Sequence, residues 1–293
     1  MASIPIAMRS RNRPVYLDTT LKSLWATDIP SDAPMIVVDD CSDDELQLKY
    51  LNTCDDFVLP QPQIWRRDAK FVNAAATFAP VHRLKGIADK VEVVHPEMRM
   101  GVFHGVFWCV QYMMERFPEA EAIILIEADA VFHKDWYTTL MNVFPEVQHA
   151  KGPNGDTLGL LTCYDRIGSG QGDDPPWTWR KVKKLANGHW GCSRAIGGVV
   201  YLVHREFYKR AIDVFRQLAL GGRPGKVSGD TAIQGLAGDR NCNLAATRPS
   251  FCQHIGVESL AWPSKGYRYC RNCKKPIAFE DEGPDGYFSK DWQ

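Results

Sequence analysis

Two carboxylates follow a strongly apolar run of this sequence. Glu127 and Asp129 come directly after residues 122–126, and Ala128 separates them. The β-branched content of the run is typical of a strand buried on both faces of a parallel sheet. Carboxylates at the carboxyl end of such a strand can hold a divalent cation, which in turn holds phosphates. The simpler interpretation is a buried strand that ends in solvent through acidic residues.

A second acidic pair, Asp39 and Asp40, follows the apolar run at 35–38. If both runs are strands of one parallel sheet, their carboxyl ends meet at the same edge. One of these aspartates is then placed to read the base or the ribose of a nucleotide, and we favour Asp40. The alternative is that the two carboxylates cap the turn that follows them.

Three further polar residues occur at positions suited to chemistry. Arg13 precedes Pro14, which opens a predicted helix, and it can make a bidentate contact to a diphosphate or a base. Asp230 can act as a general base, or it caps the helix that begins near residue 228. His254 can ligate a metal or contact phosphate, or it is a buried histidine held by hydrogen bonds.

The elements that position these residues alternate along the chain. The apolar runs predict strands at 3–8, 35–38, 91–94, 122–126, 158–162 and 197–203. The helical spacing of apolar residues predicts helices from Pro14, over much of 71–88, and over 101–116, 134–147, 204–219 and from 228. Residues 164–195 show no clear periodicity and are expected to form a long functional loop. The alternation predicts an α/β domain with a doubly wound, mostly parallel sheet and helices on both faces.

The loop after the first strand lacks the glycines of nucleotide-binding turns. Residues 9–14 read Arg-Ser-Arg-Asn-Arg-Pro, and the chain has no Walker-type phosphate loop. A nucleotide bound by this sheet would therefore be held by side chains and a metal.

Composition limits the classes of partner. The 293 residues have a formal net charge of zero, which excludes a global basic field for nucleic acid or membrane but leaves room for a local basic face. No run approaches the roughly 18 apolar residues of a membrane helix. The N-terminal segment lacks the basic and apolar regions of a signal peptide, so the nine cysteines are expected to be reduced in a cytoplasm.

One cysteine pair has metal-ligand spacing. Cys270 and Cys273 form a single Cys-x-x-Cys. Structural Zn²⁺ takes four ligands, and no second pair has clean spacing. The sequence therefore favours an ordinary surface turn over Zn²⁺ at these two residues.

Several motifs occur together in a recognisable order. They are Asn12–Leu17, Val37–Ser42, Glu127–Asp129, Gly198–Tyr208, Ser228–Asp230 and Gln253–Gly256. In this order they resemble GT-A glycosyltransferases, most closely the group of N-acetylglucosaminyltransferase I and protein O-mannose N-acetylglucosaminyltransferase. The resemblance covers roughly residues 3–260. It implies a GT-A fold, with a Rossmann-like sheet and an elaborated C-terminal half.

The resemblance also implies domain limits. The GT-A domain would span residues 1–262, with a nucleotide-sugar-binding half at 1–150 and an acceptor-binding half at 151–262. Residues 263–293 would form a C-terminal tail.

Roles for the polar residues follow from the same resemblance. Asp129 would bind Mn²⁺ or Mg²⁺, with His254 as a second ligand, and Glu127 would contact the sugar or a metal-bound water. Arg13, with Asp39 and Asp40, would bind the nucleotide-sugar. Ala128 departs from the family pattern, which has an acid in the middle of this element.

The implied reaction is transfer of a hexosyl or N-acetylhexosaminyl group from a nucleotide-sugar, with a UDP-sugar favoured. Asp230 is the candidate general base for the acceptor hydroxyl. A base opposite the leaving group predicts single displacement with inversion.

The acceptor is inferred from a basic and aromatic stretch that includes Trp177, Trp179, Arg180 and Lys181. Such residues suit phosphates and stacked bases. The leading acceptor is therefore a hydroxymethylated base in DNA, as used by bacteriophage DNA glycosyltransferases, in a bacterial cell or phage-infected host. A glycan, a protein or a small molecule is the alternative. The simpler interpretation is that the tryptophans pack and the charges form a solvated face.

Two functions of other classes remain open. A nucleotidyltransferase could use the same sheet and acidic strand end, although it normally carries a glycine-rich loop after the first strand. A non-catalytic protein that binds nucleotide-sugar or nucleic acid would be expected if Asp129 and Asp230 were structural.

Overall fold

A computed structural model describes most of the chain. The described residues are 3–45, 47–48, 51, 81–83, 91–96, 99–163, 177–180, 182–184, 190–192, 199–219, 229–247 and 251–254. For residues 15, 81–83, 180, 182–184, 190–192, 253 and 254 the description concerns the backbone alone.

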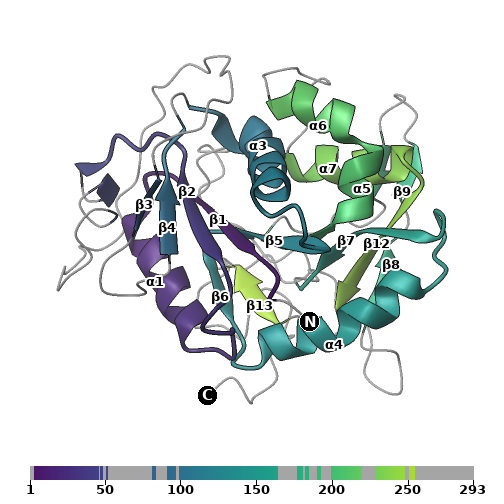
Figure 1. Ribbon diagram of the computed structural model, residues 1–293, viewed down its shortest axis with the longest axis horizontal. Coiled ribbons are helices and arrows are strands. Elements are labelled where there is room, and N and C mark those ends of the chain that lie inside the picture. The colour runs from purple at the N-terminus through teal and green to yellow at the C-terminus, as the bar shows by residue number, and fades with distance from the viewer. Residues whose placement is uncertain are drawn as a thin grey trace, which may run out of the picture.

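A nine-stranded sheet lies at the centre of the molecule (Figure 1). From edge to edge its strands are β3 (Val81–Arg83), β4 (Val91–Val94), β2 (Met35–Asp39), β1 (Ile6–Ser10), β5 (Ala122–Glu127), β11 (Val200–His204), β7 (Thr157–Thr162), β12 (Cys242–Thr247) and β8 (Trp177–Arg180). β4, β2, β1 and β5 are parallel neighbours, as are β7 and β12. β11 runs antiparallel between β5 and β7, and the two edge strands are also antiparallel to their neighbours.

Helices cover both faces of this sheet (Figure 1). They are α1 (Pro14–Trp25), α3 (Gly101–Arg116), α4 (Trp136–His149), α5 (Arg205–Arg210), α6 (Ile212–Ala219) and α7 (Gly229–Asp239). α1 and α4 lie on one face, and α3, α5, α6 and α7 lie on the other (Figure 1). The predicted α/β fold, with a Rossmann-like, mostly parallel sheet and helices on both faces, is confirmed.

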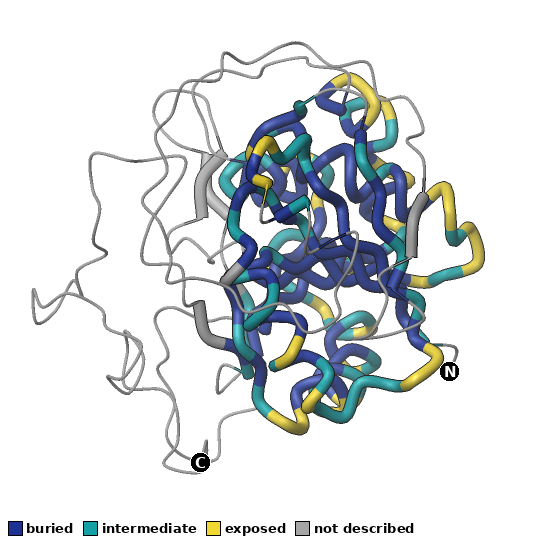
Figure 2. Tube along the Cα trace, turned by 90° about the vertical axis from the view of Figure 1, so that its left-hand side faces the viewer, coloured by how far each residue is buried: buried dark blue, intermediate teal, exposed yellow. Residues whose placement is uncertain are grey.

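The central strands are buried on both sides, as the dark core of Figure 2 shows. Along β1, Ile6 and Met8 face the core under α1 and α4, whereas Ala7 faces the core under α3. Ile124 and Leu125 alternate in the same way along β5. Burial on both faces explains why these strands appear in the sequence as continuous apolar runs.

Two small ribbons accompany the main sheet. β6 (Ala130–Phe132) pairs with β13 (Cys252–His254), and β9 (Val182–Lys184) pairs with β10 (Trp190–Cys192). Because β6 begins directly after Asp129, the first ribbon extends the sheet edge at which the acidic residues gather.

The structure corrects three predicted elements. The helix expected over 71–88 is wrong at residues 81–83, which form β3 by pairing with β4, and its other residues lie outside the described chain. The helix expected over 204–219 is interrupted at Ala211, and the bend packs Phe215 against the rings of α5. The long loop expected over 164–195 contains β8, β9 and β10, which form by pairing with distant or neighbouring strands.

Strands from both predicted halves of the chain share one sheet, since β7, β11 and β12 follow residue 150 and β1, β2, β4 and β5 precede it. The domain limits at 1–262 and 263–293 remain a prediction, and the tail lies outside the described residues. Cys270 and Cys273 lie there too. Among the described helices, none is both long and apolar enough to cross a membrane.

Candidate functional site

The carboxyl ends of β1, β2 and β5 bring several predicted residues to one edge of the sheet. The parallel register places Arg9 beside Glu127 and Ser10 beside Asp39. Arg13, at the start of α1, and Asp129, between β5 and β6, continue from the same edge.

Glu127 forms an ion pair with Arg9, whose Nη2 lies 2.6 Å from Oε1 of the carboxylate. The two side chains are 26% and 12% exposed. Burial raises the pKa of Glu127 to about 8; Arg9 opposes this rise, and Asp230 and Asp129 add to it. Glu127 therefore interacts electrostatically with both other candidate acids of the site.

Asp129 pairs with the guanidinium of Arg13, and the Asp129 side chain is only 5% exposed. The same guanidinium lies 5.4 Å from the centre of the Tyr16 ring, within cation–π range. The structure therefore brings together two residues that the sequence assigned to the donor site.

Ala128 is 4% exposed and belongs to the core under α1 and α4, and its backbone N–H donates to the Arg9 carbonyl at 3.0 Å. A carboxylate at this position would be buried among apolar side chains, which is unfavourable without a partner. Alanine at this position therefore has a packing explanation.

Asp39 is fully buried and forms the centre of a hydrogen-bond network. It accepts bonds from the hydroxyl and backbone N–H of Ser42, at 2.5 and 3.1 Å, and from Nε2 of Gln47 at 3.1 Å. Nδ1 of His95 lies 3.3 Å away. The Gln47 amide oxygen in turn accepts the backbone N–H of Arg13 at 2.9 Å. Asp39 thus helps fix the loop that carries Arg13.

Asp40 binds the start of α3 instead of capping its own turn. Its two carboxylate oxygens accept the backbone N–H groups of Met100 and Gly101 at 2.6 and 2.7 Å. Burial raises the pKa of Asp40, and these two N–H groups oppose the rise. Contact of Asp39 or Asp40 with a nucleotide remains a prediction.

Asp230 lies in the first turn of α7, where the helix dipole favours a carboxylate. Its carboxylate interacts electrostatically with Glu127, Arg9 and Tyr201. Asp230 therefore lies near the end of β5 and the neighbouring strand β11. Gln234, one turn further along α7, donates to the Tyr201 hydroxyl at 2.8 Å. The structure thus brings Asp230 into the cluster that the sequence predicted.

The metal site at Asp129 and His254 remains a prediction. The β6–β13 register places the backbone of His254 opposite Ala130, next to Asp129, and its side chain is outside the described part. The described residues contain no group of three or more histidine, cysteine, aspartate or glutamate side chains able to hold a metal. A cation bound together with nucleotide phosphates needs only one or two protein carboxylates, so Asp129 fits this role with Arg13 as a competing positive charge.

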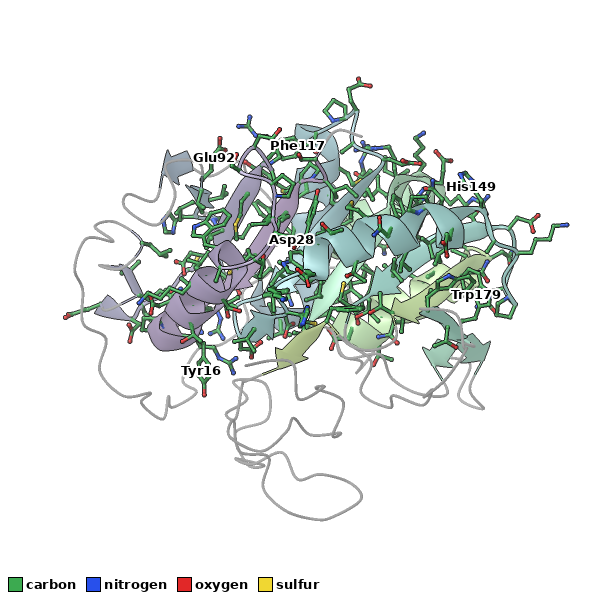
Figure 3. All side chains as sticks on the ribbon, turned by 90° about the horizontal axis from the view of Figure 1, so that it is seen from below. Tyr16, Asp28, Glu92, Phe117, His149 and Trp179 are labelled. Atoms are coloured by element: carbon green, nitrogen blue, oxygen red, sulfur yellow. The ribbon has the colours of Figure 1, made fainter. Side chains whose placement is uncertain are left out.

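The predicted acceptor residues lie away from the donor cluster. Trp177 and Trp179 are on the edge strand β8, with ring centres 4.9 Å apart, and both pack against the core. In Figure 3, Trp179 and Tyr16 lie on opposite sides of the molecule. The backbone of Arg180 pairs with Leu244, and Lys181 lies outside the described residues.

Sequence reasoning missed two residues that shape the site. Arg9 was not singled out, although the alternation of arginine at 9, 11 and 13 was a visible signal. Asn12 has a left-handed backbone (φ 48°), and its Oδ1 accepts the N–H groups of Asp43 and Asp44 at 3.0 and 3.2 Å. This contact joins the loops that follow β1 and β2.

Comparison with known proteins gives a remote structural likeness. No protein-family model matches the chain, and no curated protein matches it. Residues 1–349 of Staphylococcus aureus TarS, solved in complex with UDP-GlcNAc, are 14% identical, with a TM-score of 0.49 over 92% of this chain and 63% of that one. The mannosyltransferase PcManGT from Pyrobaculum calidifontis, in complex with GDP-Man and Mn²⁺, is 16% identical, with a TM-score of 0.46 over 86% of this chain and 56% of that one.

The glycosyltransferase GlyE of Streptococcus pneumoniae is 12% identical, with a TM-score of 0.39 over 85% of this chain and 46% of that one. The chain thus spans less than two thirds of the length of each of these structures. At such identities and TM-scores, function has to be argued from the site itself.

Proposed function

We propose that the protein is a glycosyltransferase that moves a sugar from a nucleotide-sugar, with a UDP-sugar favoured, to an acceptor hydroxyl. The observation that carries the proposal is the position of two ion pairs at the end of β5, Arg9–Glu127 and Arg13–Asp129, beside the first turn of α7, which carries Asp230. Three acids from two separate elements and two arginines meet at the carboxyl edge of the sheet, where ligands bind in open α/β folds.

The donor side would be built by Arg13, Asp129 and the loop after β2. The Arg13 fork suits the diphosphate, and Asp39 or Asp40 would contact the base or ribose. Asp129, with His254 as a second ligand, would hold Mn²⁺ or Mg²⁺, which supplies positive charge to the leaving diphosphate. Glu127 would contact the sugar or a metal-bound water.

The acceptor side would be built around Asp230. As general base, Asp230 would take the proton of the acceptor hydroxyl while the nucleoside diphosphate leaves from the opposite face, giving inversion. The group transferred would be a hexosyl or N-acetylhexosaminyl group. Asp129 directly follows β5, whereas Asp230 lies in α7, and two separate elements suit this division of roles.

A hydroxymethylated base in DNA is the acceptor we favour, with the cytoplasm of a bacterial or phage-infected cell as the setting. The β9–β10 ribbon, whose sequence contains Lys183, Lys184 and Trp190, packs against α7 and therefore lies beside the helix of Asp230. Basic and aromatic residues suit phosphates and bases. A glycan, a protein or a small molecule is the alternative acceptor.

The test is a screen of nucleotide-sugars against hydroxymethylated DNA, with UDP release followed with and without Mn²⁺. Asp230→Asn should lower kcat by about 10²–10⁴-fold, the usual contribution of a general base, while donor affinity stays unchanged. Asp213→Asn, in an exposed ion pair with Arg240, is the matched control and should have no effect.

Three results would contradict parts of this proposal. Unchanged UDP release in both Asp129→Asn and Asp230→Asn would exclude the assigned roles. Release with unmodified DNA or water alone would contradict the DNA acceptor. Release of pyrophosphate would indicate a nucleotidyltransferase, and donor binding without turnover would indicate a non-catalytic binding protein.

A further inference from the structure

Arg9 joins two elements of the candidate site. Its Nη2 donates to Oε1 of Glu127 at 2.6 Å, at the end of β5. Its Nη1 donates to the carbonyl oxygen of Val102 at 3.0 Å, in the first turn of α3. A Cβ on Gly105 would lie 3.4 Å from the same Nη1, so α3 passes directly over the guanidinium. One side chain therefore ties the end of β5 to α3.

The start of α7 rests on the same carbonyl. A Cβ on Gly229 would lie 3.0 Å from the Val102 oxygen and 3.1 Å from Cγ2 of Val106. A side chain at this position would therefore push α3 and α7 apart by a few tenths of an ångström. Asp230 is the next residue, so the Val102 carbonyl separates Arg9 from the turn that carries the candidate base.

The charge of Arg9 is compensated by the acids around it. Its guanidinium interacts electrostatically with Glu127, Asp230 and Asp40. A buried positive charge requires such partners. The planar guanidinium can bind two acceptors in fixed directions, whereas the ammonium of lysine acts as a point charge. Substitution of Arg9 by lysine therefore keeps the positive charge but removes the two directed hydrogen bonds.

We propose that Arg9 is a positioning residue, which sets the separation of Glu127 and Asp230 by holding the end of β5 against the turn of α3 on which α7 rests. The inference depends on the proposed function, in which Glu127 faces the donor and Asp230 the acceptor. A displacement of about 1 Å between groups that must act together can lower a rate by about a hundredfold.

Steady-state kinetics of Arg9→Lys and Arg9→Gln test this role. Arg9→Lys should lower kcat by about 10–100-fold with donor KM within about threefold, and Arg9→Gln should lower kcat further. Arg116→Gln, which removes an exposed ion pair with Glu92 at 3.2 Å, is the control and should leave kcat unchanged. A kcat within about twofold of wild type in both Arg9 variants, or a loss confined to KM, would overturn the proposal.

A double-mutant cycle tests the route through α3. Gly229→Ala should displace the first turn of α7 and lower kcat without touching Arg9. If both residues act through the Val102 carbonyl, the double variant Arg9→Lys with Gly229→Ala should show a smaller fold-decrease in kcat than the product of the decreases in the two single variants. Strictly multiplicative losses would show independent effects and would overturn this part of the proposal.

Amide hydrogen exchange gives a readout that does not need turnover. Both Arg9 variants should exchange faster than wild type in the first turns of α3 and α7, and Arg116→Gln should not. Unchanged exchange in both turns would overturn the proposal. If Arg9→Gln does not fold, hydrogen exchange of Arg9→Lys alone tests the positioning role. Faster exchange in a protein that turns over no nucleotide-sugar would support Arg9 as a positioning residue and contradict the proposed function.

Discussion

Arginine side chains at the end of β1 form ion pairs with carboxylates from other segments. Three arginines separated by single residues each meet an acid from another segment, in the pairs Arg9–Glu127, Arg11–Asp43 and Arg13–Asp129. The carboxylates balance the positive charges of these arginines when no donor is bound. On the proposed function, the diphosphate would replace Asp129 as the partner of the Arg13 guanidinium, while Arg9 keeps its contact with Glu127.

The pairing of Arg13 with Asp129 predicts competition between arginine and a cation. Arg13→Gln removes the positive charge nearest Asp129, so Mn²⁺ should bind about tenfold more tightly, the equivalent of one charge-assisted hydrogen bond. UDP-sugar binding should weaken in the same variant. Electron paramagnetic resonance of free Mn²⁺ measures the first effect. Arg11→Gln, whose partner is the exposed Asp43, is the control, and equal Mn²⁺ affinity in all three proteins would contradict competition.

Residue type and place in the chain were enough to predict part of the site. Asp129 and Glu127 follow an apolar run, and Arg13 precedes a proline that opens a helix, so these positions are visible locally. Arg9 lies within a strand, and its partner is 118 residues away. Asp40 binds backbone groups 60 residues away. Contacts over such separations depend on strand order, which local patterns do not specify.

At the scale of elements, α3 depends on a residue outside it. Its own N-cap residue, Met100, makes no side-chain cap, and Asp40 supplies the acceptor for two of the first N–H groups. The helix α3 is therefore fastened to the loop after β2.

Removing this cap should destabilise the protein. Asp40→Ala should lower the free energy of unfolding by about 1–2 kcal/mol, the usual effect of losing an N-terminal cap. Asp213→Ala, which removes an exposed carboxylate paired with Arg240, should change it by less than about 0.5 kcal/mol. Urea denaturation at neutral pH measures both, and equal effects of the two substitutions would contradict the capping role.

His204 makes the start of α5 sensitive to acid. Its Nδ1 accepts the Glu206 N–H at 3.3 Å, and burial lowers its pKa below the ordinary 6.5, against the attraction of Glu121 and Glu206; His149 and Lys209 lower it further. The unfolded chain thus takes up the proton at a higher pH than the folded chain. The stability of the fold should therefore fall as the pH decreases from about 6.5 through the folded pKa.

His204→Asn keeps a cap acceptor but removes the titrating ring. The free energy of unfolding of this variant should therefore change less between pH 7 and pH 5 than that of the wild-type protein. Urea denaturation at several pH values measures the slope for both proteins. A wild-type slope no steeper than that of His204→Asn would contradict this role of His204.

Elements with a strong local pattern were predicted well. The apolar face of residues 101–116 and the run at 91–94 gave the observed limits of α3 and β4. β3 and β8 are edge strands defined by their partners, so their own sequences carried little signal. The break between α5 and α6 arises from aromatic packing around Phe215, which the helical spacing does not encode.

At the scale of the whole molecule, the two cores share the same strands. Each central strand gives alternate residues to the core under α1 and α4 and to the core under α3, α5, α6 and α7. Loss of packing on one face should therefore weaken the sheet on which the other face also depends.

Phe215→Ala tests this coupling. Phe215 is fully buried against Phe107, Phe207 and Tyr208, and its loss should lower the free energy of unfolding by about 3–5 kcal/mol. Circular dichroism and tryptophan fluorescence should show one coincident transition, shifted to lower urea. Arg216→Ala, at an exposed neighbouring position, is the control. Two separate transitions would contradict a single domain across residues 1–262.

The pairing of β13 with β6 affects the order in which the site is completed. The strand beside Asp129 is closed by residues 252–254, which a ribosome adds long after β1, α1 and β5. Because synthesis proceeds from the N-terminus, a growing chain that ends before residue 252 cannot form this ribbon. On the proposed function, the donor site is thus complete only after residue 254 has been added, long after its carboxylates.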